Sequence, residues 1–320
     1  MSRIALWFYR NEGGHIILEQ LQRGLRSRGH EVYADFDMRR CIVENGRVLT
    51  EDGVDLLDFD LLYHMNADEM SPYQRDVLAA IERAGVQVVN SYKTFIATYD
   101  KFVANTLLRQ RGLRVPDATL VPATVSLAQL ERIFARYEKV VVKRRLGHGG
   151  IGVQRFDTPE RLFDFILATR DVFADYYLEK YIDFAGRDCR VDILDGKFIG
   201  GYSRRRNHYF KTNVHARAEM LPIPPTEEQI AYALSTAAAL EIDATIIDMV
   251  VGADERLYVL EVNPILGVFT GVGLKTGVNT IQSESDIHPI FAYDDRKVAA
   301  LVDFLDARAR RPRSVPSVAS

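Results

Sequence analysis

The sequence predicts an α/β protein in which a small parallel α/β domain precedes two α+β lobes. Up to residue 98, apolar strand-like runs alternate with helical segments, which is typical of a parallel sheet with helices on both faces. Farther along, strand-like runs follow one another across short turns such as Asp195-Gly196, which favours antiparallel hairpins. The chain has 320 residues and is 47% hydrophobic, which is enough for two or three domains or lobes.

The elements of the first domain, residues 1–98, follow from their periodicity. An apolar run at residues 4–9 predicts a buried strand, and apolar residues at helical spacing predict a helix at 16–28 that Gly29 ends. Asn45-Gly46 predicts a tight turn. The other predicted elements of this domain are strands at 31–34, 60–63 and 86–89 and a helix at 72–84.

Two further lobes are predicted at residues 99–178 and 179–305. Asp100 is expected to cap a helix that Gly112 ends, and Thr226 is expected to cap another. A further helix is predicted at 127–137, another begins at Thr158, and the helix that Thr226 caps is predicted to end at Leu240. The predicted strands are 139–143, 153–156, 177–182, 190–195, 197–203, 244–251 and 257–260. The end of the chain, residues 306–320, is rich in Arg, Ser and Pro and is predicted to be a disordered tail.

Composition restricts the classes of partner. The chain has 41 basic and 44 acidic residues, and a net charge of −3 argues against general nucleic-acid or membrane binding. Cys41 and Cys189 have no paired spacing, no Cys/His cluster has the spacing of zinc ligands, and the apolar run at 4–9 is too short for a signal sequence. We therefore expect a cytoplasmic protein that binds neither nucleic acid nor membranes.

Three oxygen-bearing side chains predict a metal site. The segments around Asp248 and Glu261 read as two strands joined by a turn. If Val251 pairs with Tyr258, Asp248 lies opposite Glu261, with Cβ atoms about 5 Å apart, whereas a slip of one residue would send Asp248 to the other face. Asn263 shares a face with Glu261 because residues two apart on a strand point the same way. Two carboxylates and an amide oxygen suit Mg²⁺; the alternative is that both carboxylates are ordinary solvent-facing residues.

A glycine-dense loop at residues 147–152 predicts a flap over phosphates. It formally matches G-x-G-x-x-G, but the next residues read as extended, whereas a dinucleotide-binding fingerprint needs a helix there. The loop is expected to join two antiparallel strands, with Gly149, Gly150 and Gly152 allowing backbone N–H groups to approach an anion. Lys143, which ends the preceding strand, is expected to pair with that anion. The alternatives are a plain flexible loop and a lysine that reaches solvent.

A series of short motifs occurs in order between about residues 90 and 280. The motifs are Asn90-Ser91, Asp100-Lys101, 141–143 with the glycine loop, 178–182, 186–190, Lys211-Thr212-Asn213, Asp248 and 261–264. Each motif is weak evidence alone, whereas their order is specific. In this order they resemble the ATP-grasp superfamily and, within it, the RimK-like carboxylate–amine ligases.

The resemblance implies an ATP-grasp fold, in which two α+β lobes enclose ATP, with Mg²⁺ as the metal and Mn²⁺ as a substitute. The cofactor-binding residues it implies are the phosphate-contacting Lys101, Lys143 and Lys211, the flap glycines Gly149, Gly150 and Gly152, the adenine-binding hinge Glu179, Lys180, Tyr181 and Ile182, and the ribose-binding Asp188. Lys211 stands where relatives usually carry Arg, and Lys lacks the bidentate fork, so this contact would be looser.

The resemblance also implies the residues that act on the reacting groups. Arg190 and Asn213 would face the γ-phosphate and the acceptor carboxylate, and Arg204 would bind the acyl phosphate or the substrate carboxylate. His64 lies near the place where some relatives carry a substrate-reading arginine. The implied metal ligands, which would hold two Mg²⁺ ions, are Asp248, Glu261 and Asn263.

The reaction implied by the resemblance is ATP-dependent formation of an amide or peptide bond through an acyl phosphate. Its partners would be a carboxylate and an amine, on an amino acid, a peptide or a related metabolite, and the chain would self-associate as relatives do. Two alternatives stay open: a kinase on the same fold that phosphorylates a small-molecule hydroxyl, and a non-catalytic nucleotide-binding module.

Overall fold

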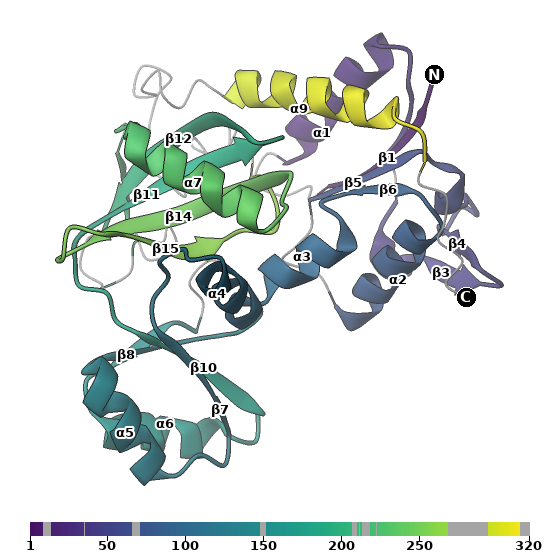
Figure 1. Ribbon diagram of the computed structural model, residues 1–320. Helices are drawn as coiled ribbons and strands as arrows, with labels where there is room; N and C mark the ends of the chain where they lie inside the picture. The colour runs from purple at the N-terminus through teal and green to yellow at the C-terminus, as the bar shows by residue number, and fades with distance from the viewer. Residues whose placement is uncertain are drawn as a thin grey trace.

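Three sheets organise the chain, one in the N-terminal domain and one in each of two lobes (Figure 1). The computed structural model describes residues 1–8, 14–34, 36–65, 71–147, 152–206, 210, 212, 218–221, 223–267 and 294–313. The N-terminal sheet has the order β2-β1-β5-β6, and all of its pairings are parallel, as predicted. Its strands are β1 (Arg3–Phe8), β2 (Glu31–Tyr33), β5 (Leu61–Met65) and β6 (Gln87–Val89).

Helices cover both faces of the N-terminal sheet. On one face, Leu6 belongs to a core cluster with α1 (Gly14–Ser27) and α9 (Asp294–Ala309). On the other face, Trp7 belongs to a separate cluster with α2 (Pro72–Arg83). Adjacent residues of one strand thus point to opposite faces, as the pleat requires. Figure 1 shows that α9, from the end of the chain, lies beside α1.

The C-terminal helix corrects the predicted disordered tail. α9 continues to Ala309, and the Arg313 guanidinium lies 3.4 Å from the Asp60 carboxylate, so residues 306–313 are folded onto the N-terminal domain. Leu301 and Leu305 are fully buried in the cluster with α1. The arginine-rich composition concealed this helix because only a narrow apolar face is needed to dock it. The rest of the tail, 314–320, lies outside the described residues.

The N-terminal domain also contains the predicted tight turn. β3 (Ile42–Glu44) and β4 (Arg47–Leu49) pair antiparallel around Asn45 and Gly46, whose φ angles are 49° and 78°. Positive φ at both central residues is the geometry that favours Asn-Gly in two-residue hairpins. Two 3-10 turns, η1 (Met38–Arg40) and η2 (Leu56–Asp58), flank this hairpin.

His64, on β5, is a core residue. Its side chain is 1% exposed, its ring packs edge-on to Phe95, and its Nε2 lies 3.3 Å from the Asn90 carbonyl oxygen. A side chain buried in this way cannot read a substrate. Burial lowers the pKa of His64 to about 4, because a charged imidazolium would lose its hydration.

The depressed pKa of His64 predicts a pH-dependent loss of stability. The unfolded chain binds a proton at His64 near pH 6.5, whereas the folded chain resists it down to about pH 4. The free energy of unfolding should therefore decrease as pH falls between these values, by at most about 3 kcal/mol from this group. Urea unfolding of wild type and His64→Gln at pH 7 and pH 4.5 measures it. An equal pH dependence in the two proteins would contradict the assignment.

The small lobe is an antiparallel sheet of order β7-β10-β8-β9. α5 (Leu127–Tyr137) and α6 (Pro159–Thr169) pack on it through a core of its own. β8 and β9 pair antiparallel on either side of residues 148–151, as predicted for the flap strands. The strands are β7 (Ala118–Pro122), β8 (Val140–Lys143), β9 (Gln154–Phe156) and β10 (Asp175–Lys180).

The large lobe is a five-stranded sheet of order β13-β12-β11-β14-β15, with α7 (Glu227–Ala239) on one face. Leu194 and Ile246 of this sheet belong to the same core cluster as α1 and α9, so the large lobe and the N-terminal domain share one core. The strands are β11 (Phe184–Leu194), β12 (Lys197–Arg205), β13 (Glu219–Leu221), β14 (Ala244–Gly252) and β15 (Leu257–Val262).

Two helices connect the N-terminal domain to the lobes. α3 (Tyr92–Tyr99) leads into α4 (Lys101–Gln110), and Figure 1 shows α4 close to the junction of the two lobes. Asp100 caps α4 as predicted, because its carboxylate accepts hydrogen bonds from the N–H groups of Phe102 and Val103. Among the helices that the structure describes, none combines the length and apolarity of a membrane span.

Candidate functional site

The candidate site is a pocket between the small lobe and the large lobe. Most of the predicted site residues line it: Lys101, Lys143, Glu179, Lys180, Tyr181, Ile182, Asp188, Arg204, Asp248 and Glu261. The sequence analysis missed the apolar wall formed by Phe184, Phe210 and Leu260. The available signal for Phe210 was its place directly before the Lys211-Thr212-Asn213 motif.

Asp248 and Glu261 face each other across β14 and β15, as predicted, but the predicted register is wrong at the turn. Val251 pairs with Leu257 instead of Tyr258. A register shift follows at Leu260, which is an extra residue on β15, and this bulge restores the pairing of Asp248 with Glu261. The bulge thus gives Glu261 the face toward the pocket.

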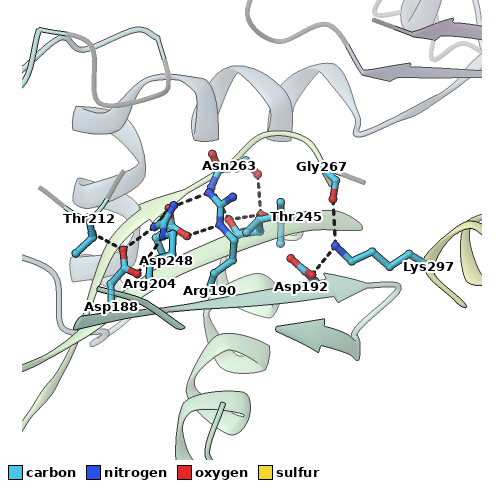
Figure 2. Close-up of polar contacts among 11 residues, drawn as sticks. Asp188, Arg190, Asp192, Arg204, Thr212, Thr245, Asp248, Asn263, Gly267 and Lys297 are labelled. Atoms are coloured by element: carbon cyan, nitrogen blue, oxygen red, sulfur yellow. Dashed lines mark hydrogen bonds and ion pairs between the residues drawn. The ribbon is translucent and has the colours of Figure 1, made fainter. Parts of the chain in front are cut away.

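Asp248 is held in the pocket wall by two arginines (Figure 2). Arg190 Nε and one terminal nitrogen donate to its two oxygens at 2.9 and 3.2 Å, and Arg204 lies 3.0 Å from Oδ2. Burial would raise the pKa of Asp248, but the two guanidinium groups outweigh burial and lower this pKa to about 2. Asp248 is therefore a carboxylate at neutral pH.

Arg204 lies between two aspartates. It donates to Asp188 Oδ1 at 3.0 Å and Oδ2 at 2.6 Å, and it also pairs with Asp248. Thr212 donates its hydroxyl hydrogen to Asp188 as well (Figure 2). Arg204 is 3% exposed and Asp188 is 2% exposed. These charges neutralise one another inside the fold, as buried ions require.

Two of the predicted phosphate-binding lysines, Lys101 and Lys143, are paired with carboxylates. Lys143 Nζ lies 2.6 Å from Glu179 Oε2 and donates to the Leu260 carbonyl at 3.3 Å. Lys101 Nζ lies 2.9 Å from Glu261 Oε1 and contacts the Gly147 carbonyl. Each lysine contacts the large lobe and the small lobe: Lys143, on β8 of the small lobe, reaches Leu260 of the large lobe. Lys101 contacts Gly147 of the small lobe and Glu261 of the large lobe. An entering phosphate would therefore replace a carboxylate as the partner of each lysine ammonium group.

The hinge after β10 offers a donor to a ligand. The N–H of Lys180 donates to the Asp117 carbonyl at 2.7 Å, and that of Tyr181 donates to the Lys139 carbonyl at 2.9 Å. No described residue accepts a hydrogen bond from the Ile182 N–H, although Ile182 lines the pocket. A planar base with a ring acceptor could fill this role.

Aromatic rings close the same end of the pocket. The Tyr181 ring lies 6.5 Å from the Phe210 ring, and the Arg155 guanidinium lies 5.2 Å from the first ring and 5.6 Å from the second. Arg155 comes from β9 of the small lobe, and Phe210 follows β12 of the large lobe. The contact of Arg155 with these two pocket-lining rings therefore joins the small lobe to the large lobe.

The other predicted site residues fall into two groups. Gly149, Gly150, Lys211 and Asn213 lie outside the described residues. Gly152 has a φ of +73°, and Arg190 contacts the site through Asp248. Asn263, directly after β15, donates through Nδ2 to the Ile246 carbonyl at 2.9 Å.

The side-chain oxygen atoms of Asp248, Glu261 and Asn263 are of the kind that suits Mg²⁺. Among the described residues, no group of three or more His, Cys, Asp or Glu side chains is arranged for a metal ion, so the predicted set depends on the Asn263 amide. The Nδ2 bond leaves Asn263 Oδ1 without a donor among the described residues, and Glu261 Oε2 has none either. Asp248 Oδ1 accepts one bond and can accept another. Oxygen donors of this kind are those that Mg²⁺ prefers.

Comparison with known proteins identifies similar sequences. A model of the RimK-like ATP-grasp domain matches residues 98–283. The coenzyme gamma-F420-2:alpha-L-glutamate ligase of Methanococcus maripaludis is 24% identical over 213 residues, which are 65% of this chain and 73% of the relative. A probable alpha-L-glutamate ligase of Teredinibacter turnerae is 26% identical over 263 residues, which are 81% and 86% of the two chains.

Solved structures share the fold. The ATP-grasp ligase PsnB, in complex with a minimal precursor, superposes with a TM-score of 0.64 at 19% identity, over 96% of this chain and 99% of PsnB. The D-alanine–D-alanine ligase of Bacillus anthracis, in complex with ATP, gives a TM-score of 0.64 at 18% identity, over 97% and 99% of the two chains. The family model covers more than half of the sequence, and the chain belongs to the RimK-like ATP-grasp family.

Proposed function

We propose that this protein is an ATP-dependent carboxylate–amine ligase that forms an amide or peptide bond through an acyl phosphate. One observation carries the proposal: Lys101, Lys143, Asp248 and Glu261 line a single pocket between two lobes of an ATP-grasp fold. Cations for phosphate and oxygen ligands for Mg²⁺ thus line one pocket. In a relative of the same fold, PsnB, the bound groups include Mg and ADP.

The nucleotide is proposed to lie along the pocket from the hinge to the carboxylates. The Ile182 N–H would donate to the adenine edge, and Asp188 would accept from the ribose through Oδ1, which now accepts one bond. Lys101 and Lys143 would leave Glu261 and Glu179 for the phosphates. Asp248, Glu261 and Asn263 would hold Mg²⁺, for which Mn²⁺ can substitute; the bound ion neutralises phosphate charge.

The proposed reaction has two steps. A carboxylate oxygen of the substrate attacks the γ-phosphorus, the bond to the bridging oxygen breaks, and ADP leaves with that oxygen. An amine then attacks the acyl carbon, phosphate leaves, and the nitrogen loses a proton as the amide forms. Little covalent help from the protein is needed, so alignment and charge neutralisation by Lys143 and Arg190 carry most of the effect.

Arg204, the flap, Asn213 and Lys211 complete the proposed scheme. Arg204 already donates to two aspartates, so its proposed contact with an acyl phosphate requires it to release one of them. The flap between β8 and β9 would exclude water, which otherwise hydrolyses the acyl phosphate. Asn213 and Lys211 are proposed to act beside Arg190 at the γ-phosphate.

A substrate panel tests the proposed function. Amino acids and short peptides are supplied with ATP and Mg²⁺, and ADP, phosphate and product mass are followed together. Because the named relatives are α-L-glutamate ligases, L-glutamate heads the panel. We expect acceptor-dependent ADP release with an equal amount of amide. Release of AMP and pyrophosphate, a phosphorylated product, or nucleotide binding without turnover would each contradict the ligase.

A further inference from the structure

The segment that carries Asn263 is fastened to the N-terminal domain by Asn90. The Asn90 side chain follows β6 and is 3% exposed. Its Nδ2 donates to the Pro264 carbonyl at 2.7 Å and to the Ala244 carbonyl at 2.8 Å, and its Oδ1 accepts from the Ala244 N–H at 2.9 Å. One amide thus joins the first residue of β14 to the residue directly after Asn263 and uses both of its donor hydrogens.

The other end of this segment is fastened by Lys297 from α9. Lys297 Nζ lies 2.6 Å from Asp192 Oδ2 on β11 and donates to the Gly267 carbonyl at 3.1 Å (Figure 2). Both charged side chains are almost completely buried, at 1% and 0% exposure. An ion pair buried to this extent has little freedom to move, because separation would leave a charge without water or partner.

Bonds within the large lobe fix Asn263 itself. Its backbone N–H and its Nδ2 both donate to the Ile246 carbonyl, each at 2.9 Å, and its carbonyl accepts the Thr245 hydroxyl at 2.7 Å (Figure 2). The direction of Oδ1 therefore depends on where the backbone of residues 263–267 lies. Asn90 and Lys297 determine that place from the two ends of the segment.

We propose that Asn90 and Lys297 are positioning residues that clamp residues 263–267 and thereby fix the Asn263 amide oxygen at the proposed metal site. The inference rests on the proposed function, because it treats Asn263 as a metal ligand. It assigns a role to the Asn90-Ser91 motif and to α9. The N-terminal domain and the large lobe share one core, so the clamp joins the segment of Asn263 to that shared core.

The first test measures metal binding directly. Mn²⁺ binding is followed by electron paramagnetic resonance with a non-hydrolysable ATP analogue, in wild type and in Asn90→Ala. We expect the half-saturating Mn²⁺ concentration to rise about tenfold or more, as for other residues that orient a ligand. The affinity for the analogue without metal should change less than twofold. Asn90→Ser, which keeps a small polar group, serves as a second variant if Asn90→Ala does not fold.

Gln87→Ala is the matched control. Gln87 is the first residue of β6, the strand that directly precedes Asn90, and its amide donates to two backbone carbonyls, those of Arg308 and Arg311, at 3.1 Å each. It therefore ties the same strand to α9 without touching residues 263–267. Unchanged Mn²⁺ binding in Asn90→Ala would overturn the proposal. An equal loss in Gln87→Ala would also overturn it, since the effect would then be a general loosening of the domain.

Hydrogen exchange in the ligand-free protein separates the clamp from the proposed function. The amides of Asn263 and Gly267 should exchange at least tenfold faster in Asn90→Ala, and also in the double variant Lys297→Met/Asp192→Asn, which removes the ion pair without leaving a buried charge. Unchanged exchange would refute the clamp. Faster exchange in a protein whose wild type binds no Mn²⁺ would confirm the clamp and refute the metal role of Asn263.

Discussion

Glu261→Gln is expected to lower kcat by about three orders of magnitude or more while the fold and nucleotide binding persist. The change removes one negative charge from the pair that Asp248 and Glu261 form across β14 and β15. A metal ligand acts chiefly where charge moves during phosphoryl transfer, so its loss appears in kcat more than in KM. Lys101 loses its carboxylate partner at the same time and becomes available to phosphate.

Two measurements make the Glu261 prediction specific. Calorimetry with a non-hydrolysable ATP analogue should give an affinity equal to or tighter than that of wild type. Glu255→Gln, in the exposed turn between β14 and β15, should leave kcat within twofold. Loss of analogue binding together with a lowered melting temperature in Glu261→Gln would show that Glu261 supports the fold and would remove it from the proposed metal set.

Lys143→Met is expected to weaken ATP binding by roughly ten- to a hundredfold, the usual effect of losing a charged hydrogen bond. Lys143 reaches from the small lobe to Glu179 and to the Leu260 carbonyl of the large lobe, so it also helps to hold the lobes together. The single variant leaves the Glu179 carboxylate buried beside the phosphates. Part of its effect would therefore be repulsion.

The double variant Lys143→Met/Glu179→Gln separates these two contributions. If the lysine contacts phosphate directly, ATP affinity stays low in the double variant; if repulsion dominates, affinity recovers. Lys139→Met is the control, because Lys139 is exposed and directly precedes β8, the strand that ends in Lys143. Wild-type ATP affinity in Lys143→Met would disprove the assignment of Lys143 to the phosphates.

Local patterns in the sequence predicted much of the fold. α5 occupies the residues that its apolar spacing indicated, and the flap strands β8 and β9 lie within the segments that were predicted to be extended. Four helices or strands escaped. α9 was hidden by the Arg-rich stretch in which it ends, and α3 is rich in Thr and Tyr, which are weak helix formers. β7 is a half-exposed edge strand that ends in proline, and β13 has only three residues.

The sequence predicted which residues belong to the site better than it predicted the contacts among them. The residue types and their order along the chain identified Lys101 and Lys143, and also Asp248 and Glu261, the two carboxylates of the proposed metal site, all of which line the pocket. The pairing of Arg204 with Asp188 and of Lys143 with Glu179 was not visible, because such partners meet only through strand order and register. Val259 and Val262 are three residues apart and both lie in the core. In a regular strand they would point to opposite faces, so this spacing was the sequence signal of the bulge, and a reading that assumed strict alternation missed it.

The extra residue at Leu260 separates the strand register at the outer end of this hairpin from the register at the two carboxylates. Residues 252–256 also contact the hinge region, because the Ala253 N–H donates to the Asp183 carbonyl at 2.8 Å. A protein engineer could exchange that loop for a longer one, or for an epitope tag, and the carboxylates would keep their alignment. Deletion of Leu260 alone would remove the bulge: Glu261 would then follow Val259 directly, would point to the opposite face from Val259, and would still lie opposite Asp248.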